Sequence, residues 1–473
     1  MSYRDLRSFL NRLEQEGQLV YVHDEIMPEP DIRKISRAAA DMPNGPAVIM
    51  DNIKGYRGKR VVMNVHGSWA NHAVMLDLPK ETSLKEQFYA LDKRWVGCTG
   101  EVKFVDNPPC QEVVITKDIN LFHILPLFRV NKYDGGCYFA KASIISKDPE
   151  DPDNFDKVNV GMYRLQVQGP DTIGMQALAF HDLAIQLRKA EEVNQPLPVA
   201  IALGVDPFLS LAACTPLRYD ESEYKFAAGL SGVPQEVAKA VTCDLYIPAN
   251  AEYVIEGEVI PRQRFPEGPF GEMPGSYSGV RRQVQIKVKA VTHRKDPIFE
   301  NLYVGRPWTE HDTLIGLATS VPLYRQIKET MPEVVAVNAL YQHGLTAIVA
   351  TGNRFGGYAK SVAFRLASTP HGIAYCKNII LVDADVDPFD LVQVMWALST
   401  RVRPDKDVVV IRNTPGMPLD PSSEPPGMGC KLIIDATTPA PPDKLMREVR
   451  MVEKLEVGEY QKLLSNLLAA AGK

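Results

Sequence analysis

Two glutamates lie five residues apart in the segment FPEGPFGEMPG, residues 265–275. The three prolines and three glycines around Glu267 and Glu272 argue against a regular helix or an internal strand. A paired arginine lowers the pKa of a glutamate, whereas an apolar pocket raises it until the acid can donate a proton near neutral pH. The segment therefore predicts a loop whose two acids can take two chemical roles.

The arginine that could join these acids lies in the segment NVGMYR, together with an amide side chain. We expect this segment to be a strand, and on a flat strand Asn159 and Arg164 point to opposite faces because five is an odd offset. Both serve one site only if the strand bends or bulges there. On these residues alone, a structural ion pair and a catalytic group are both open interpretations.

Several familiar motifs fail on inspection. DADVDPFD resembles the start of a calcium loop, but its sixth position is Pro388 and the terminal acid is missing, which favours a strand-to-helix turn. The glycines of RFGGYAK have neither dinucleotide nor Walker spacing, and HExxH and GxSxG are absent. The seven cysteines form no CxxC. The sequence thus gives no sign of common hydrolase, nucleotide or zinc chemistry.

Composition and charge narrow the classes of partner. A chain of 473 residues with 45% hydrophobic content can bury large cores and usually divides into two or three domains. A net charge of -5 gives no bulk attraction for nucleic acid or anionic lipid. The first residues lack the pattern of a signal peptide, and no apolar run reaches transmembrane length. We expect a cytoplasmic protein that binds neither nucleic acid nor membrane.

Three parts of the chain read as α/β or helical structure. Residues 1–105 predict an N-terminal α/β domain that begins with an amphipathic helix and continues through the strands PAVIMDNI and RVVMNV. Residues 306–440 predict a C-terminal α/β layered domain. Residues 441–473 predict a terminal helix that makes an oligomer or interdomain contact. The apolar positions of the first helix are Leu6, Phe9, Leu10 and Leu13, and those of the last are Leu445, Val449, Val452, Leu455, Leu463, Leu464 and Leu467.

The central part, residues 106–305, reads as β structure. Segments such as CYFAKASIIS, AEYVIEGEVI and QVQIKVKAVTH are rich in β-branched and aromatic residues. In the last of them, apolar Val284, Ile286, Val288 and Ala290 alternate with polar residues. This alternation predicts a sheet that is half exposed or faces a lined cavity, as in a barrel.

Five segments together resemble one known family. NVGMYR, the HD of AFHDLAIQLRKAEE, SEYKFAAGL, PEGPFGE and ILVDADVDPFDLVQVMWALSTRVRP occur in this order over nearly the whole chain. In this the sequence resembles the UbiD family of decarboxylases, which use prenylated FMN. The resemblance implies a central split β-barrel, flavin-reductase-like, as the cofactor domain. It also implies reversible decarboxylation of an aromatic acid, in which the substrate adds covalently to the modified flavin before CO₂ leaves.

The resemblance also implies roles for individual residues. Arg164, Glu267 and Glu272 match the family's Glu-Arg-Glu network, in which we expect Glu272 to donate the proton that replaces CO₂. Asn159, His181 and Glu223 match its metal ligands, a mostly hard donor set suited to Mn²⁺ or Mg²⁺ bridging to the flavin phosphate. Glu256 is the rival metal candidate but matches a structural segment. K⁺ is a further candidate ion, and further cofactor contacts are expected from Met162, Tyr163, Phe180, His371 and Lys377.

Two departures affect the substrate end of the site. His371 stands where some relatives carry a lysine, for which Lys377 is a substitute, and Pro274 follows Met273 where relatives often have His or Thr. The closest resemblance is to the subgroup acting on hydroxylated benzoates, in which His343 matches a histidine associated with the substrate. The same residue reads equally well as a histidine satisfied in a turn. Furan, pyrrole or α,β-unsaturated acids are the alternative substrates, and a flavin oxidoreductase or a non-catalytic subunit is the alternative class.

The expected partners follow from the same resemblance. They are the small aromatic acid and CO₂, a flavin prenyltransferase that supplies the cofactor, small accessory subunits, and further copies of the chain in a dimer or hexamer. No nicotinamide fingerprint supports the oxidoreductase alternative.

Overall fold

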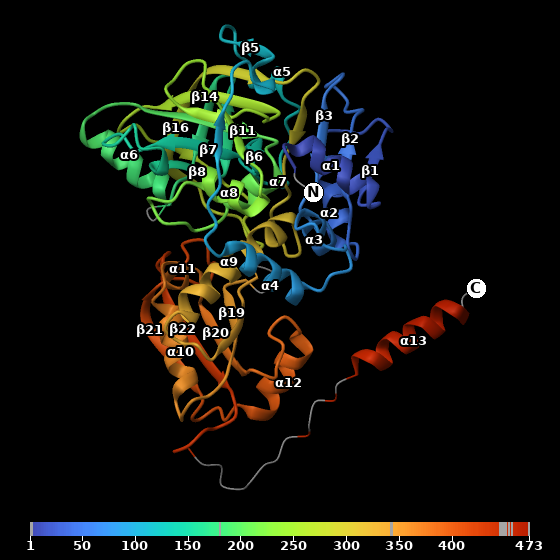
Figure 1. Ribbon diagram of the computed structural model, residues 1–473. Helices are drawn as coiled ribbons and strands as arrows, with labels where there is room; N and C mark the ends of the chain where they lie inside the picture. Colours follow the sequence, from blue (N-terminus) through green and yellow to red (C-terminus); the bar gives the residue numbers. More distant parts are fainter. Residues whose placement is uncertain are drawn as a thin grey trace.

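The computed structural model describes residues 3–178, 181–340, 344–443, 452, 455 and 457–471. In these residues the strands form four sheets, which Figure 1 shows as layered domains with a terminal helix apart from them. The expected α/β multidomain fold is confirmed. No helix among the described residues is long and apolar enough to cross a membrane.

The N-terminal elements build a four-stranded sheet in the order β1-β2-β3-β17. The apolar positions predicted for the first helix are all buried, and a capping box between Asp5 and Ser8 begins that helix. The last strand of the sheet, β17 (Ile298–Glu300), lies parallel to β3 and comes from far along the chain. The elements are α1 (Leu6–Gln15), β1 (Leu19–Val22), α2 (Asp31–Asp41), β2 (Ala47–Met50), β3 (Arg60–Met63), α3 (Trp69–Met75) and α4 (Leu84–Trp95).

The centre of the molecule is a ten-stranded sheet in the order β6-β9-β10-β16-β14-β11-β7-β8, with β5 and β15 also paired to β16. A smaller sheet has the order β13-β12-β4. The elements of this region are β4 (Val102–Phe104), η1 (Pro109–Gln111), β5 (Val113–Ile115), α5 (Leu121–Ile124), β6 (Tyr138–Phe139), β7 (Ser143–Lys147), η2 (Phe155–Lys157), β8 (Val158–Met162), β9 (Leu165–Gly169), β10 (Thr172–Met175), α6 (Asp182–Glu192), β11 (Leu197–Leu203), α7 (Pro207–Ala212), α8 (Glu223–Ser231), β12 (Gln235–Lys239), β13 (Tyr246–Pro248), β14 (Tyr253–Val259), β15 (Phe265–Glu267) and β16 (Arg281–His293).

The longest strand, β16, confirms the alternation seen in the sequence. Its apolar positions Val284, Ile286, Val288 and Ala290 are buried, and the residues between them are more exposed. Among the described residues no pairing joins β6 to β8, so the ten-stranded sheet is not closed. The split barrel therefore stays a prediction.

The C-terminal domain is a five-stranded sheet in the order β18-β19-β20-β22-β21. Its β20 ends at Asp383 and α12 begins at Leu391 with Asp390 as its N-cap, which confirms the strand-to-helix turn expected for DADVDPFD. The elements are α9 (Glu310–Lys328), β18 (Val334–Asn338), β19 (Thr346–Thr351), α10 (Tyr358–Ala367), α11 (Pro370–Tyr375), β20 (Asn378–Asp383), α12 (Leu391–Arg401), β21 (Val408–Pro415), β22 (Met428–Ala436) and the terminal α13 (Gly458–Ala471).

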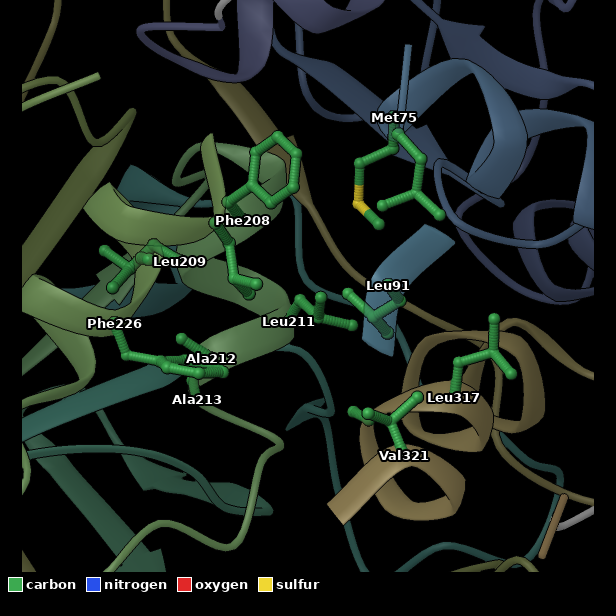
Figure 2. Packing of buried hydrophobic residues seen from close by; sticks show 14 of the residues in the cluster. Met75, Leu91, Phe208, Leu209, Leu211, Ala212, Ala213, Phe226, Leu317 and Val321 are labelled. Atoms are coloured by element: carbon green, nitrogen blue, oxygen red, sulfur yellow. The ribbon is translucent and has the colours of Figure 1, made fainter. Parts of the chain in front are cut away.

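One apolar core joins helices from all three regions. Figure 2 shows Met75 of α3 and Leu91 of α4 beside Leu211 of α7 and Leu317 and Val321 of α9. All five side chains are buried. Because α9 is the first helix of the C-terminal domain, this core helps to fix that domain against the central sheet.

Candidate active site

A cavity of about 390 Å³ opens between the central and C-terminal domains. This is within the usual size range of cofactor and substrate sites. Its central-domain lining includes Asn159, Met162, Tyr163, Arg164, His181 and Glu223. The lining also includes Glu272 and Met273, together with His311 of α9 and His371 and Tyr375 of α11. The structure therefore gathers most of the predicted site residues around one space.

The backbone at Arg164 explains how two residues at an odd offset reach the same cavity. Strand β8 ends at Met162 and β9 begins at Leu165, so Arg164 lies in the connection between two strands. The expectation of one continuous strand through NVGMYR is wrong at this point. The alternation of faces stops where the strand stops, and both Asn159 and Arg164 line the cavity.

Arg164 joins the two acids of the opening segment. Its Nε donates to Glu267 Oε1 at 3.1 Å and its Nη2 to Glu267 Oε2 at 2.6 Å, a bidentate pair. Its Nη1 donates to Glu272 and, at 3.2 Å, to Ser278 Oγ. Glu267 is the last residue of β15 and also accepts from the Tyr138 hydroxyl at 3.1 Å. We call Arg164, Glu267 and Glu272 the open cluster, because Arg164 and Glu272 border the cavity.

The two acids of the open cluster differ in their surroundings. Glu267 is 0% exposed and Glu272 is 8% exposed. Burial raises the pKa of Glu272, although the nearby Arg164 and His311 act in the opposite direction. Glu272 is therefore suited to carry a proton beside the cavity. Glu267 instead accepts two hydrogen bonds from the guanidinium group of Arg164.

The predicted metal ligands converge around Tyr163. Its hydroxyl donates to Asn159 Oδ1 at 3.4 Å, and its ring meets the His181 ring edge-on at 5.2 Å. Glu223 opens α8 and accepts from the backbone N–H of Val160 at 3.0 Å. Burial raises the pKa of Glu223 to about 8, which a bound cation would oppose. An amide oxygen, an imidazole and a buried carboxylate on one wall fit a hard divalent ion and its phosphate partner.

Other predicted residues lie elsewhere. Glu256 is buried but accepts hydrogen bonds from the backbone of Val241 and Thr242, so it has the structural role expected for it. Lys377 pairs with Asp420 at 2.9 Å and is not part of the cavity lining. Pro274 is also outside the lining, next to Met273 within it. Phe180 and His343 lie outside the described residues.

His311 and Tyr375 are among the cavity residues that sequence reasoning missed. His311 stands in the first turn of α9, where a capping box between Thr309 and Asp312 fixes the helix start. Tyr375 stacks on His371 with ring centroids 4.3 Å apart and planes at 9°. The capping pattern TEHD could have located the helix start, but no pattern indicated that it faces the open cluster.

A second buried cluster lies away from the cavity. Lys141 Nζ lies 2.5 Å from Glu300 Oε1, 2.7 Å from Glu310 Oε1 and 2.8 Å from His66 Nδ1. Within the described part of the chain, the ligand atoms of His66, Glu300 and Glu310 form the one group spaced like a metal site. The ammonium group of Lys141 satisfies them instead. We call these four residues the sealed cluster, since none lines the cavity.

Comparison with protein families decides the identity of this arrangement. Residues 10–91, 103–307 and 312–436 match, in turn, the N-terminal, Rift-related and C-terminal domains of 3-octaprenyl-4-hydroxybenzoate carboxy-lyase, which define UbiD. The chain belongs to the UbiD family. It is therefore a UbiD-type carboxy-lyase.

Individual UbiD-family proteins are similar over nearly the full chain. A phenolic acid decarboxylase of Sedimentibacter hydroxybenzoicus is 57% identical over 98% of this chain and 98% of its own. The structure of vanillic acid decarboxylase (ShVdcCD) from the same organism, in closed form, has a TM-score of 0.92 and 56% identity over 99% of both chains. The UbiD-class enzyme HmfF of Pelotomaculum thermopropionicum, as an evolved dimeric form in complex with prFMN, has a TM-score of 0.81 and 28% identity over 97% of this chain and 100% of its own.

Proposed function

We propose that this UbiD-family protein reversibly decarboxylates a hydroxylated benzoic acid, with prenylated FMN as its cofactor. The observation that carries the proposal is one cavity that is lined both by Arg164 and Glu272 of the open cluster and by Asn159, His181 and Glu223. The similar phenolic and vanillic acid decarboxylases support the substrate class, and the prFMN complex of HmfF supports the cofactor. A supply of cofactor from a flavin prenyltransferase in the cytoplasm follows from this proposal.

The cofactor has a definite place in this proposal. When bound, the prenylated flavin supplies the electron sink that an sp² carbon needs when CO₂ departs. Asn159, His181 and Glu223 would hold Mn²⁺ or Mg²⁺ against its phosphate, with K⁺ as a further ion, and Met162 and Tyr163 border the same space. The long β16 and the strands paired with it support a split barrel as the form of this domain.

Retention of the flavin tests the metal ligands. Replacing His181 or Glu223 with Ala should reduce the flavin that remains bound after gel filtration, because the phosphate loses its metal bridge. Glu221→Ala is the matched control, since this acid is exposed and lies two residues before Glu223. Undiminished occupancy in both ligand variants would exclude the metal role.

The open cluster performs the proton transfer. Glu272, buried and with a raised pKa, holds a proton at the cavity wall and gives it to the carbon that has lost CO₂. Arg164 orients the Glu272 carboxyl with one hydrogen bond, while two others go to Glu267 and one to Ser278. In the reverse direction the Glu272 carboxylate takes the same proton from the aromatic carbon.

The residues that contact the substrate are the part of the proposal that the family resemblance supports least. His311 lines the cavity near Glu272 and is our candidate acceptor for a phenolic proton, which would push electrons toward the ring. Met273 and His371 border the same space. The role expected for His343 stays a prediction. Furan, pyrrole or α,β-unsaturated acids are the second substrate classes, compatible with the same open cluster.

The direct test uses protein produced together with a flavin prenyltransferase. The small molecule released from it should have the absorbance and mass of prenylated FMN. CO₂ release should be fastest from 4-hydroxybenzoate or vanillate, and slow from furan and pyrrole carboxylates. Turnover of the heteroaromatic acids alone would overturn the substrate assignment, and no turnover of any acid by flavin-loaded protein would overturn the function.

We also propose that the protein is a homo-oligomer, either a dimer or a hexamer, with small accessory subunits as further partners. In α13 the side chains of Leu463, Leu464, Leu467 and Leu468 are all more than half exposed, at 53%, 59%, 56% and 74%. Light scattering at micromolar concentration should give a multiple of the chain mass. Leu464→Asp should weaken the assembly and the adjacent Ser465→Asp should not. A monomeric wild-type protein would contradict the proposal.

A further inference from the structure

One of the C-terminal elements that line the cavity is a very short helix. Helix α11 (Pro370–Tyr375) has six residues, and a helix of that length is not stable by itself. Its N-terminus is capped by Thr369, whose hydroxyl accepts from the Gly372 N–H at 2.9 Å. It contacts α9, α10 and β21. The position of its side chains in the cavity must therefore be imposed by the surroundings.

A buried lysine holds the other end of α11. Lys431, in the middle of β22, is 4% exposed, and its Nζ lies 2.7 Å from Gly372 O, 2.9 Å from Ile373 O and 2.9 Å from Cys376 O. These are carbonyls that the end of a helix leaves without partners inside the helix. All three N–H groups of the ammonium thus donate to backbone carbonyls at the end of α11. A buried charge is costly unless it has such hydrogen-bond partners, so this contact fixes the lysine and the helix end together.

The side chains presented by this helix are the stacked pair His371 and Tyr375. They stand one helical turn apart, and both line the cavity. Burial lowers the pKa of His371 to about 3, so its ring is neutral. Burial raises the pKa of Tyr375, so its hydroxyl keeps its proton. The pair is a neutral aromatic part of the lining of the cavity that Glu272 also borders.

We propose that Lys431 is a positioning residue, which holds α11 so that the His371–Tyr375 pair closes the cavity opposite Glu272 and seats the aromatic acid. The inference rests on the proposed function for its substrate, but the anchoring of α11 does not. Lys431 is outside the cavity lining and the open cluster, and the backbone that it holds is that of α11, so its effect on the reaction should pass through the side chains of α11.

A double-mutant cycle tests this route. In the flavin-loaded enzyme with 4-hydroxybenzoate, Lys431→Met should lower kcat/KM about tenfold, and Lys431→Arg should recover most of the loss because it keeps charge and donors. In a Tyr375→Leu background the same Lys431→Met change should cost less than twofold, since the pair is already lost. Lys360→Met, which removes an exposed hydrogen bond to the Lys406 carbonyl in the same domain, should leave both backgrounds unchanged. Equal losses from Lys431→Met in both backgrounds would overturn the proposal.

A second measurement does not depend on turnover. Amide hydrogen exchange of the peptide 369–377 should be faster in Lys431→Met than in wild type, and unchanged in Lys360→Met. Unchanged exchange in Lys431→Met would overturn the proposal even if the substrate assignment is correct. Faster exchange would support the anchoring of α11 even if the substrate assignment is wrong. Lys431→Gln, which keeps one donor without the charge, serves both measurements if the Met variant does not fold.

Discussion

The open cluster and the sealed cluster have nearly the same composition and different chemistry. Each holds one cationic side chain between two buried glutamates. The open cluster borders a cavity of about 390 Å³, and the sealed cluster borders none of it. A buried group of charges is thus not by itself a site. What distinguishes the open cluster is a protonatable acid facing a space in which a reacting carbon can lie.

The charges of the two clusters are also balanced differently. Burial would raise the pKa of Glu310, but Lys141 and His66 overcome it and lower that pKa to about 2. In Glu300 burial prevails over Lys141 and raises the pKa to about 7. In the sealed cluster the ammonium group is hydrogen-bonded to both acids and to the imidazole, so no proton is presented to a ligand. In the open cluster the acid with the raised pKa is the one at the cavity wall.

The largest expected effect is on turnover. Glu272→Gln keeps the size of the side chain but removes the transferable proton, so kcat should fall by roughly two to four powers of ten. Flavin occupancy should survive, because Glu272 is not among the predicted metal ligands. If Glu272→Gln retains more than about a tenth of wild-type turnover, the assignment of the proton transfer to the open cluster is wrong.

The next effect is on stability and comes from the sealed cluster. Lys141→Met leaves two buried acids without their cation and should reduce the free energy of unfolding by about 3–5 kcal/mol. Urea denaturation measures this loss, and Lys147→Met, whose partner Asp244 is exposed, is the control. A loss in Lys141→Met no greater than in the control would show that the sealed cluster is not structural.

A smaller effect distinguishes the two acids of the sealed cluster. At pH 6 Glu300 is mainly protonated in the folded protein, because its pKa is raised to about 7, so Glu300→Gln should cost less than about 1 kcal/mol. Glu310→Gln removes the ionised partner of Lys141 and should cost about 3 kcal/mol. Equal losses in the two variants, measured by urea denaturation, would contradict this assignment of charge.

The last effect is on the pH dependence of stability and concerns a buried histidine, His72. Burial lowers the pKa of His72 to about 4 from an ordinary value of 6.5, with a further lowering by His66, and its Nδ1 lies 2.9 Å from Gln87 Oε1. The stability it contributes is present above pH 6.5 and is lost as pH falls toward 4, because only the unfolded chain binds the proton. The slope is up to about 1.4 kcal/mol per pH unit. His72→Gln should flatten the decline in that window, and an unchanged slope would refute the assignment.

The sequence alone predicted much of the fold, and for identifiable reasons. The periodicities of α1 and β16 record burial directly, so both elements and their buried faces were predicted correctly. The end of β8 at Met162 was not, because Tyr163 and Arg164 have nothing in their side chains that forbids a strand. The secondary-structure preferences of single residues do not predict that a strand ends where it borders a cavity.

Some residues of the candidate site were predicted from the sequence and others were not. The residues of the open cluster were found from an unusual segment and a family resemblance, and the structure brings them within hydrogen-bonding distance. His311, Tyr375 and Lys431 were missed. The roles of His311 and Tyr375 depend on α9 and α11 bordering the cavity, and that of Lys431 depends on β22 lying against α11. These are tertiary arrangements that no local sequence pattern indicates.

The central claim is that Glu272 carries the proton, and hydrogen exchange into the product tests it most directly. Incubating the flavin-loaded enzyme with the phenolic product in D₂O measures proton transfer at the decarboxylated carbon without net loss of CO₂. The account predicts that wild type exchanges this hydrogen and that Glu272→Gln does so at least about a hundredfold more slowly with its flavin retained. Exchange by Glu272→Gln at the wild-type rate, with flavin bound, would contradict it.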